Sequence, residues 1–365
     1  MKRIAFVHNN FPAGGAERIT IDIARYLKSV GGYQVYVYTT RVSLSLMTDE
    51  VRDLVNIRII PSQAVQSRRS AAVEELLLQD SIDILVQVTK SLKGIEDIRQ
   101  RTGCKTVVAC HGEPFWQRHA IMHRRQKGFL RKMMWILFNK RRYADGTLAM
   151  KKAVERTRRD YHACDAYTVL CEPYISQVAE ALGLDAATSH IHAIENPDLP
   201  VNEVCWNKES VVMFCGRFEN WSKRIDRLLR IWGKVQNRLP DWKLVLVGDG
   251  PADKMLRQLA VDLGLERISF EGRQSDVASY YRKASIVCLT SETEGWVLSL
   301  TEAQAQGCIG VAFGATSGIK EILGEDETCG YVVPSFDEDA YADTLLKIAS
   351  MSKEQQNVIR KAAVE

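Results

Sequence analysis

Two glutamates, Glu294 and Glu302, stand eight residues apart in the segment SETEGWVLSLTEAQAQG and could act together on a ligand. The apolar run before them, 286–290, suits a buried parallel strand, and the segment from Val297 has the apolar spacing of a helix that ends near Gly307. One carboxylate would follow a strand, and the other would lie within about two turns of a helix N-terminus. Amides of the first helical turn lack partners within the helix. Such a corner can bind an anion and hydroxyl groups.

A pair of cations is the second candidate for chemistry. A predicted strand ends at Cys215, Gly216 and Arg217, and Lys223 follows at the start of a helix that we expect near Ser222. An arginine and a lysine beside a strand end and a helix N-terminus can neutralise a diphosphate. Exposed cations are common, and so are two glutamates at this separation. The spacing alone therefore does not distinguish a binding site from a solvated surface.

Two polar motifs in the first half also follow predicted strands. Gly14 and Gly15 open a predicted helix from about Ala16, and a glycine pair there lets the backbone approach a phosphate or an oxyanion. A simple helix cap explains the same pair equally well. His111 and Gly112 follow the strand KTVVAC, so the histidine would line a cleft, although a single histidine is more often structural. The GxGxxG fingerprint is absent, which argues against a nicotinamide enzyme.

Further turns follow strands in the second half. Residues 248–251 (GDGP) lead from a strand into a helix, and residues 270–272 (FEG) lead into a loop where Arg273 and Gln274 could contact a base. Ordinary turn chemistry explains both loops as well as ligand binding does.

These motifs need a scaffold of parallel strands, and the pattern of the whole chain predicts one. Apolar runs alternate with helical segments, as in α/β domains with parallel sheets. The expected strands are 4–7, 33–40, 57–60, 82–88, 105–110, 166–170 and 190–194, then 211–215, 243–247, 268–270, 286–290, 310–313 and 330–333. Because ligands in such sheets bind at the carboxyl ends of strands, two doubly wound domains would face each other across a central cleft.

The length of 365 residues suits two domains. The segment ENPDLPVNEVCWNKES, with Pro197 and Pro200, is polar and has no periodicity. We therefore expect a Rossmann-like domain at 1–196, a hinge at 197–209 and a second Rossmann-like domain at 210–365.

Composition excludes several classes of protein. The 46% of hydrophobic and 26% of charged residues are typical of a globular chain. No stretch approaches the ~20 apolar residues of a membrane span, and the start MKRIAFVHNNF has too short an apolar run for a secretory signal. Nine scattered cysteines, without a CxxC pair or a histidine cluster, predict reduced thiols of a cytosolic protein, with neither disulfides nor a metal site.

Positive charge is concentrated in residues 118–159. Fourteen Lys or Arg stand there against Asp145 and Glu155, a local excess of twelve, whereas the whole chain carries +4. Apolar side chains alternate with cations in the segment FLRKMMWILFNKRR. A core helix with a solvated face explains this pattern as well as an interfacial helix on anionic lipid does. Nucleic acid would suit the charge, but no known binding motif accompanies it, so no nucleic-acid partner is expected.

The order of the motifs resembles family 4 (group 1) of the retaining glycosyltransferases, which have the GT-B fold. The resemblance rests on GGAER at 14–18, HG at 111–112, NP at 196–197, GR at 216–217 with Lys223, GDGP at 248–251, FEG at 270–272, the glutamates at 294 and 302, and SGIKE at 317–321. The motifs of the second half are highly specific together, whereas the first half matches only at short motifs. The implied fold is α/β, with an acceptor-binding and then a nucleotide-sugar donor-binding Rossmann-like domain.

The resemblance also implies roles for the candidate residues. Arg217 and Lys223 would neutralise the donor diphosphate, which stabilises the departing nucleotide. Glu302 would bind the ribose, and Glu294 would bind the transferred sugar, which His111 would also contact. The remaining donor contacts would come from Gly15, Gly216, Gln274 and the amides of Gly295, Trp296 and Val297.

The implied reaction is the transfer of a hexose or N-acetylhexosamine with retention at the anomeric carbon, without a metal or another cofactor. Enzymes of this kind are thought to use front-face attack, in which a donor phosphate oxygen takes the acceptor proton, so no general base is required. UDP is favoured over GDP as the donor nucleotide. The basic stretch 118–159 suggests a lipid-linked glycan acceptor at an anionic membrane surface, as in polysaccharide or lipopolysaccharide synthesis.

Two features depart from the family pattern. Trp296 and Val297 stand where the family often has Phe-Gly, so the local backbone could differ. The sequence also stops at RKAAVE, before the helix with which relatives usually cross back to the first domain, which suggests a shortened chain. We expect the protein in the cytoplasm, either free or peripheral on the inner face of the plasma membrane. The alternatives are a GT-B enzyme with a soluble acceptor and a catalytically silent glycan-binding scaffold.

Overall fold

The computed structural model describes residues 1–61, 66–88, 92, 94–118, 133, 146–197, 201 and 203–364. The chain divides into two compact units, Met1–Pro197 and Asp198–Glu365, each with its own sheet. Within the predicted interfacial stretch 118–159, residues 119–132 and 134–145 lie outside the described residues, as do 198–200 and 202 of the predicted hinge 197–209.

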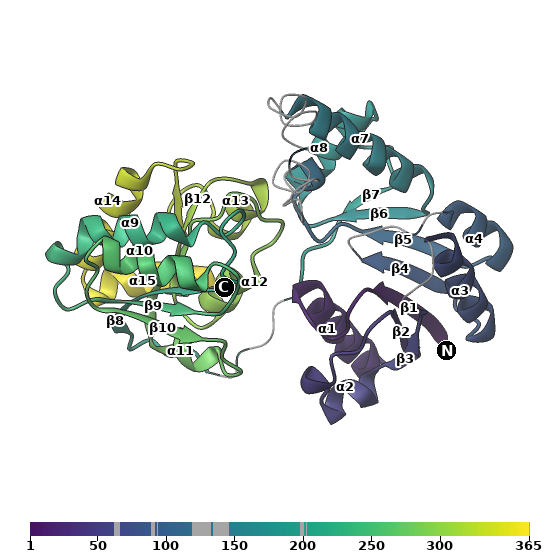
Figure 1. Ribbon diagram of the computed structural model, residues 1–365, viewed down its shortest axis with the longest axis horizontal. Coiled ribbons are helices and arrows are strands. Elements are labelled where there is room, and N and C mark those ends of the chain that lie inside the picture. The colour runs from purple at the N-terminus through teal and green to yellow at the C-terminus, as the bar shows by residue number, and fades with distance from the viewer. Residues whose placement is uncertain are drawn as a thin grey trace. The chain divides into compact units, whose positions relative to one another are not determined.

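The first unit contains a sheet of seven parallel strands (Figure 1). The strands are β1 (Lys2–His8), β2 (Tyr33–Thr39), β3 (Asn56–Ile59), β4 (Ile84–Val88), β5 (Lys105–Ala109), β6 (Ala166–Val169) and β7 (Ile191–Ala193). Their order is β3-β2-β1-β4-β5-β6-β7. The order reverses between β1 and β4, and in doubly wound folds ligands bind at the carboxyl ends of strands beside such a reversal.

Helices cover both faces of this sheet. They are α1 (Gly15–Val30), α2 (Asp49–Leu54), α3 (Gln66–Gln79), α4 (Ile95–Thr102), α7 (Thr147–His162) and α8 (Glu172–Leu182), with a 3-10 turn η1 (Leu44–Leu46). Alternate side chains of β1 explain the two layers, because Ile4 and Phe6 pack with α1 and α2, whereas Ala5 and Val7 pack with α3 and α4. Burial on both faces accounts for the continuous apolar runs of the sequence.

The second unit contains a sheet of six parallel strands. The strands are β8 (Glu209–Cys215), β9 (Lys243–Val247), β10 (Ile268–Gly272), β11 (Ala284–Leu289), β12 (Ile309–Phe313) and β13 (Gly330–Val333). Their order, β10-β9-β8-β11-β12-β13, is the doubly wound order of Rossmann folds. Here the reversal lies between β8 and β11.

Helices also cover both faces of the second sheet (Figure 1). They are α9 (Ile225–Val235), α10 (Asp253–Asp262), α11 (Ala278–Lys283), α12 (Leu298–Ala305), α13 (Ser317–Leu323), α14 (Glu338–Ser350) and α15 (Lys353–Val364), with a 3-10 turn η3 (Gln236–Arg238). Val212 and Phe214 of β8 pack with α9, α10 and α14, whereas Val211 and Met213 pack with α11 and α12.

The strands predicted from the sequence are all present, with ends that differ by at most two residues. One helix start was wrong. The helix expected near Ser222 begins at Ile225, because Arg224 adopts a left-handed φ of 45°, which a helix cannot contain. Lys223 therefore lies in a turn before α9. Among the helices that the structure describes, none is both long and apolar enough to cross a membrane.

Candidate functional site

The candidate site of the second unit lies where β8 and β11 end side by side. The two strands pair in parallel, so their carboxyl ends meet at one edge of the sheet. Gly216 and Arg217 follow β8, while Glu294 lies in the loop between β11 and α12. These three predicted residues therefore lie at the edge where the strand order reverses.

An ion pair joins the two loops at this edge. Lys223 Nζ lies 2.6 Å from Glu294 Oε1, and the two side chains are only 24% and 11% exposed. The pair brings together a cation and a carboxylate that are distant in sequence. By contrast, Arg217 is exposed, and its guanidinium has no hydrogen-bond or ion-pair partner among the described residues. A phosphate group could therefore take Arg217 directly and compete with Glu294 for Lys223.

Two backbone turns beneath Arg217 are packed against each other. A Cβ atom on Gly248 would overlap the carbonyl oxygen of Gly216, and a Cβ atom on Gly250 would lie 2.5 Å from the carbonyl oxygen of Phe218. The amide of Phe218 donates to the carbonyl of Asp249 at 2.8 Å. This close packing requires the glycines of GDGP. It therefore favours the interpretation of the motif as a structural turn. These glycines also fix the backbone that carries Arg217.

The loop after β10 is also fastened to its neighbours. Arg273 Nη2 lies 3.0 Å from Asp249 Oδ1, so this arginine is paired with the turn after β9. Gln274 Nε2 donates to the carbonyl of Glu271, near the end of β10, at 2.7 Å. Both residues lie at the carboxyl edge of the sheet, as predicted, and each already forms a hydrogen bond within the protein.

The turn into α12 contains Gly295, Trp296 and Val297. Val297 is the N-cap of α12, and its side chain is buried in a cluster with residues of β11, β12 and α13. The indole Nε1 of Trp296 is buried and lacks a hydrogen-bond partner among the described residues. Glu302 is in the second turn of α12. The two residues that depart from the family pattern thus shape this corner through an apolar N-cap and a buried indole.

The first unit holds a cluster of hydrogen-bonded polar groups at the same edge of its sheet. His8, the last residue of β1, is buried, with Nε2 2.9 Å from Thr20 Oγ1 and Nδ1 3.3 Å from Glu17 Oε1. His111, which follows β5, has Nδ1 3.1 Å from Asn196 Oδ1. Burial lowers the pKa of His111, although the bond to Asn196 acts in the opposite direction. A neutral imidazole suits a contact with a hydroxyl group.

The glycine pair at the start of α1 lies against an acidic side chain. Gly14 is the N-cap, with φ of 144°, and Gly15 is the first helical residue. A Cβ atom on Gly14 would lie 2.5 Å from Glu17 Oε2. The Glu17 carboxylate therefore covers this helix N-terminus, where negative charge is favourable. A phosphate that approached Gly15 would meet this carboxylate first.

Sequence reasoning did not single out His8 and Glu17. The sequence around each residue contains a signal by which it could have been identified. His8 ends an apolar strand in the same way as His111, and Glu17 stands three residues after the N-cap Gly14, where acidic residues often cap a helix.

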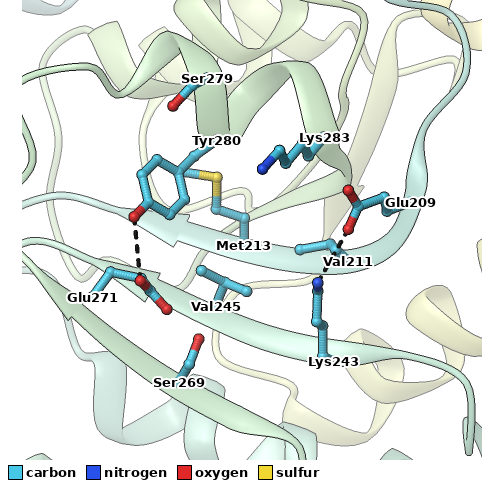
Figure 2. A pocket seen from close by; sticks show the side chains of 10 residues that line it. All are labelled: Glu209, Val211, Met213, Lys243, Val245, Ser269, Glu271, Ser279, Tyr280 and Lys283. Atoms are coloured by element: carbon cyan, nitrogen blue, oxygen red, sulfur yellow. Dashed lines mark hydrogen bonds and ion pairs between the residues drawn. The ribbon is translucent and has the colours of Figure 1, made fainter.

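A separate cavity of about 470 Å³ lies on one face of the second sheet (Figure 2). Its floor is formed by Val211, Met213 and Val245, and Lys243 beside it lies 3.1 Å from Glu209. Its other lining residues are Ser269, Glu271, Ser279, Tyr280 and Lys283. None of the predicted donor-site residues lines this cavity.

The described residues contain no cluster of three or more His, Cys, Asp or Glu side chains that could hold a metal ion. The cysteines are free, and six of the nine are buried.

Two family profiles match the chain. The profile described as "Glycosyl transferases group 1" matches residues 202–364, and the profile "Glycosyltransferase Family 4" matches residues 13–197, a little over half of the chain.

Two curated proteins illustrate the similarity in sequence. An "Uncharacterized glycosyltransferase" of Haemophilus influenzae is 36% identical over 143 residues, which cover 38% of this chain but only 40% of that protein. The "GalNAc-alpha-(1->4)-GalNAc-alpha-(1->3)-diNAcBac-PP-undecaprenol alpha-1,4-N-acetyl-D-galactosaminyltransferase" of Campylobacter jejuni is 22% identical over 354 residues, 94% of this chain and 88% of that protein.

A solved structure shares the fold. The crystal structure of Anabaena HepE in complex with UDP and glucose aligns with a TM-score of 0.70 at 17% identity, over 100% of this chain and 94% of that one. The predicted α/β GT-B class, with two Rossmann-like domains, is confirmed. The central cleft between the domains stays a prediction.

Proposed function

The chain belongs to glycosyltransferase family 4, and from this premise we propose that it is a retaining transferase that uses a nucleotide diphosphate sugar. It transfers a hexose or an N-acetylhexosamine to a lipid-linked glycan in polysaccharide or lipopolysaccharide synthesis. The observation that carries this proposal is the Lys223–Glu294 ion pair beside the exposed Arg217 at the β8–β11 strand ends. Cations next to a hydroxyl-binding carboxylate are what a sugar diphosphate requires.

Each donor residue has a task in this proposal. Arg217 and Lys223 hold the diphosphate and balance the charge that develops on it as the glycosidic bond breaks. Glu294, once Lys223 turns to the phosphate, accepts hydrogen bonds from the sugar, and Glu302 binds the ribose. A donor phosphate oxygen takes the acceptor proton at the face from which the leaving group departs, so the anomeric configuration is retained. The two cations provide the charge, and the proposed reaction uses no metal.

His111 contacts the transferred sugar in this proposal. Its lowered pKa favours the neutral imidazole, which can donate or accept a hydrogen bond without attracting a second phosphate. Asn196 fixes the ring through Nδ1, so Nε2 is the nitrogen left for the sugar.

Two similar proteins support the choice of substrates. The name of the Campylobacter relative specifies an undecaprenol-linked acceptor and an N-acetylgalactosaminyl group, and HepE was crystallised with UDP and glucose. We accordingly favour a UDP-sugar donor and a polyprenyl-linked acceptor. The free cysteines fit a reducing compartment, so we place the enzyme in the cytoplasm at the inner face of the membrane.

A ligand screen tests the donor. Thermal-shift and calorimetric titration with UDP, GDP and ADP, and with their sugars, should show stabilisation by UDP, because a ligand that binds only the folded state raises its stability. Arg217→Ala and Glu294→Ala should each reduce hydrolysis of the bound sugar nucleotide. A chain that binds no nucleotide and turns over no donor would instead be a silent glycan-binding scaffold.

Membrane association has its own test. Arg124, Arg125, Arg131 and Lys132 lie outside the described residues, and they are four of the fourteen basic residues in the stretch 118–159. Reversing these four charges should reduce co-sedimentation with vesicles that contain anionic lipid, since each basic side chain near such a surface contributes about 1 kcal/mol. Unchanged sedimentation would contradict membrane binding and favour a soluble acceptor.

A further inference from the structure

A chain of charged side chains lies beside the Lys223–Glu294 pair and joins the same two loops. Glu292 Oε2 accepts a hydrogen bond from Arg224 Nη1 at 3.2 Å and another from Arg227 Nη2 at 2.7 Å. Arg224 directly follows Lys223, and Glu292 stands two residues before Glu294. The contact of Glu292 with Arg224 therefore acts next to both members of the ion pair at the predicted donor site.

Arg224 adopts a backbone conformation that its neighbours must maintain. Its φ of 45° and ψ of 44° are left-handed, a region that residues with a side chain rarely occupy. Its guanidinium pairs with both carboxylate oxygens of Asp226, at 3.0 and 3.1 Å, in a two-point contact. Burial opposes the ionised form of Asp226, but hydrogen bonds and charge from Arg224 and Arg230 outweigh it and lower the pKa of this carboxyl.

Arg227 is fixed on the other side of Glu292. Its side chain is 9% exposed and lies 4.1 Å from the centre of the Phe336 ring. Its Nη1 donates to the carbonyl of Thr290 at 3.5 Å. Because the Arg227 guanidinium is buried and stacked on a ring, it gives Glu292 a fixed hydrogen-bond donor in the first turn of α9.

Backbone contacts run between the same two loops. The amide of Glu292 donates to the carbonyl of Ser222 at 2.6 Å, and Thr290 Oγ1 donates to the carbonyl of Arg224 at 3.0 Å. Residues 222–224 and 290–294 thus meet through one backbone hydrogen bond, one bond from the Thr290 hydroxyl to a backbone carbonyl, and ionic contacts between side chains. The position of Lys223 depends on both.

We propose that Glu292 is a positioning residue for the donor site. Through Arg224 and Arg227 it fastens the turn 222–224 to the loop 290–294, and so fixes where Lys223 Nζ meets Glu294 and the diphosphate. The inference rests on the proposed function for its consequence in catalysis. Glu292 itself does not touch the reacting atoms.

The test compares Glu292→Gln with Glu338→Gln. Glu338 is a matched control, because it is 20% exposed against 28% for Glu292 and accepts hydrogen bonds from Arg230 at 2.7 to 3.1 Å. Both variants remove a carboxylate charge from an arginine contact, while Arg224 and Arg230 keep Asp226 as a partner, so we expect similar losses in melting temperature. Only Glu292→Gln should weaken UDP binding, by about tenfold, as expected when a charged hydrogen-bonding group is displaced.

A second measurement follows Lys223 without any nucleotide. After reductive ¹³C-methylation, the Lys223 signal is assigned by its absence in Lys223→Arg. We expect Glu292→Gln to shift this signal, and Glu338→Gln to leave it unchanged. Arg224→Gly should act like Glu292→Gln, because glycine tolerates the left-handed φ while the side-chain contacts are lost. This variant keeps the test decisive if Glu292→Gln folds poorly.

The outcomes separate the two proposals. An unmoved Lys223 signal in both Glu292→Gln and Arg224→Gly would overturn the positioning role, as would equal losses of UDP affinity in Glu292→Gln and Glu338→Gln. If Lys223→Met does not weaken UDP binding, or if UDP does not bind at all, the donor-site assignment fails. In that case, the ¹³C-methyl signal of Lys223 still tests whether Glu292 positions Lys223, because this measurement needs no nucleotide.

Discussion

The two units carry polar groups at equivalent edges of similar sheets, but the chemistry of these groups differs. In the first unit, His111 follows a strand and forms a hydrogen bond with Asn196, a neutral partner, and its pKa is lowered by burial. In the second unit, Lys223 and Glu294 form an ion pair, and the exposed guanidinium of Arg217 has no partner in the part of the chain that the structure describes. In the proposed function, similar sheets thus present a neutral hydrogen-bonding site for hydroxyl groups in one unit and a charged site for phosphates in the other.

The difference shows that the arrangement of strands and helices alone does not determine which ligand is bound. Both sheets bring strand ends together at a reversal of strand order, and the residues placed there determine the ligand. If the comparison is correct, changes in the second unit should act mainly through charge, and changes in the first should act through hydrogen bonding.

Removing the charge of Lys223 should have the largest effect. Lys223→Met keeps the length of the side chain but removes the cation that balances the departing diphosphate, so sugar transfer should slow by about 100- to 1000-fold. Steady-state transfer assays with the preferred sugar nucleotide measure this loss. Lys243→Met, at the cavity of Figure 2, is the matched control and should retain activity. If Lys223→Met slows sugar transfer by less than about threefold, changes in the second unit do not act mainly through charge, and the comparison between the two units is wrong.

Substitution of His111 should have a smaller effect. His111→Asn loses a neutral hydrogen bond to the sugar, which corresponds to a change of about tenfold in kcat/KM. The exposed His192 on β7 provides the control, since His192→Asn removes an imidazole without touching the cluster. Affinity for UDP alone should not change in either variant. If His111→Asn weakens UDP binding as strongly as Lys223→Met does, the division between the two units is wrong.

Raising the ionic strength should weaken UDP binding at the charged site of the second unit by a few-fold. Salt screens exposed charges over about 10 Å at 0.1 M, so UDP binding at Arg217 should weaken as salt increases. Calorimetric titration of UDP at 0.05 and 0.5 M salt measures this dependence, and Arg217→Ala should reduce it. If UDP binding depends on salt equally in Arg217→Ala and in the unchanged protein, Arg217 does not contact the phosphates.

The pH dependence of His111 is the smallest expected effect. Its pKa in the folded protein is lowered by burial from the usual value of about 6.5, so the unfolded chain takes up the proton first as pH falls. The contribution of His111 to stability is therefore complete above that value and is lost as pH falls through the folded-state pKa. Melting temperatures between pH 7.5 and 5 should fall less steeply in His111→Asn. An equal slope would contradict a lowered pKa of His111 in the folded protein.

Most of the fold could be predicted because buried parallel strands leave a strong signal. Strands such as β9 and β13 are continuous apolar runs between turns, and their ends were predicted without error. The start of α9 was not, since the left-handed Arg224 depends on contacts with Asp226 and Glu292, of which the latter is 68 residues away. Tertiary contacts of this kind have no local signature.

The candidate site was predictable in outline and less so in detail. Arg217, Lys223 and Glu294 could be selected because cations and carboxylates that follow strands meet at one edge of a parallel sheet. The pairing of Lys223 with Glu294 could not be read from spacing, because the two residues are 71 positions apart. The roles of Glu302, Gln274 and Gly15 toward a ligand stay predictions.

The contact between Gly216 and Gly248 has a consequence for engineering. Because the turn after β8 touches the turn after β9 backbone to backbone, a side chain at position 248 would push apart two strands rather than reshape a pocket. A randomised library aimed at a new donor should therefore leave positions 216, 248 and 250 fixed. Variation is better placed at Arg273 and Gln274, which lie on the same edge and form side-chain hydrogen bonds rather than close backbone packing between strands.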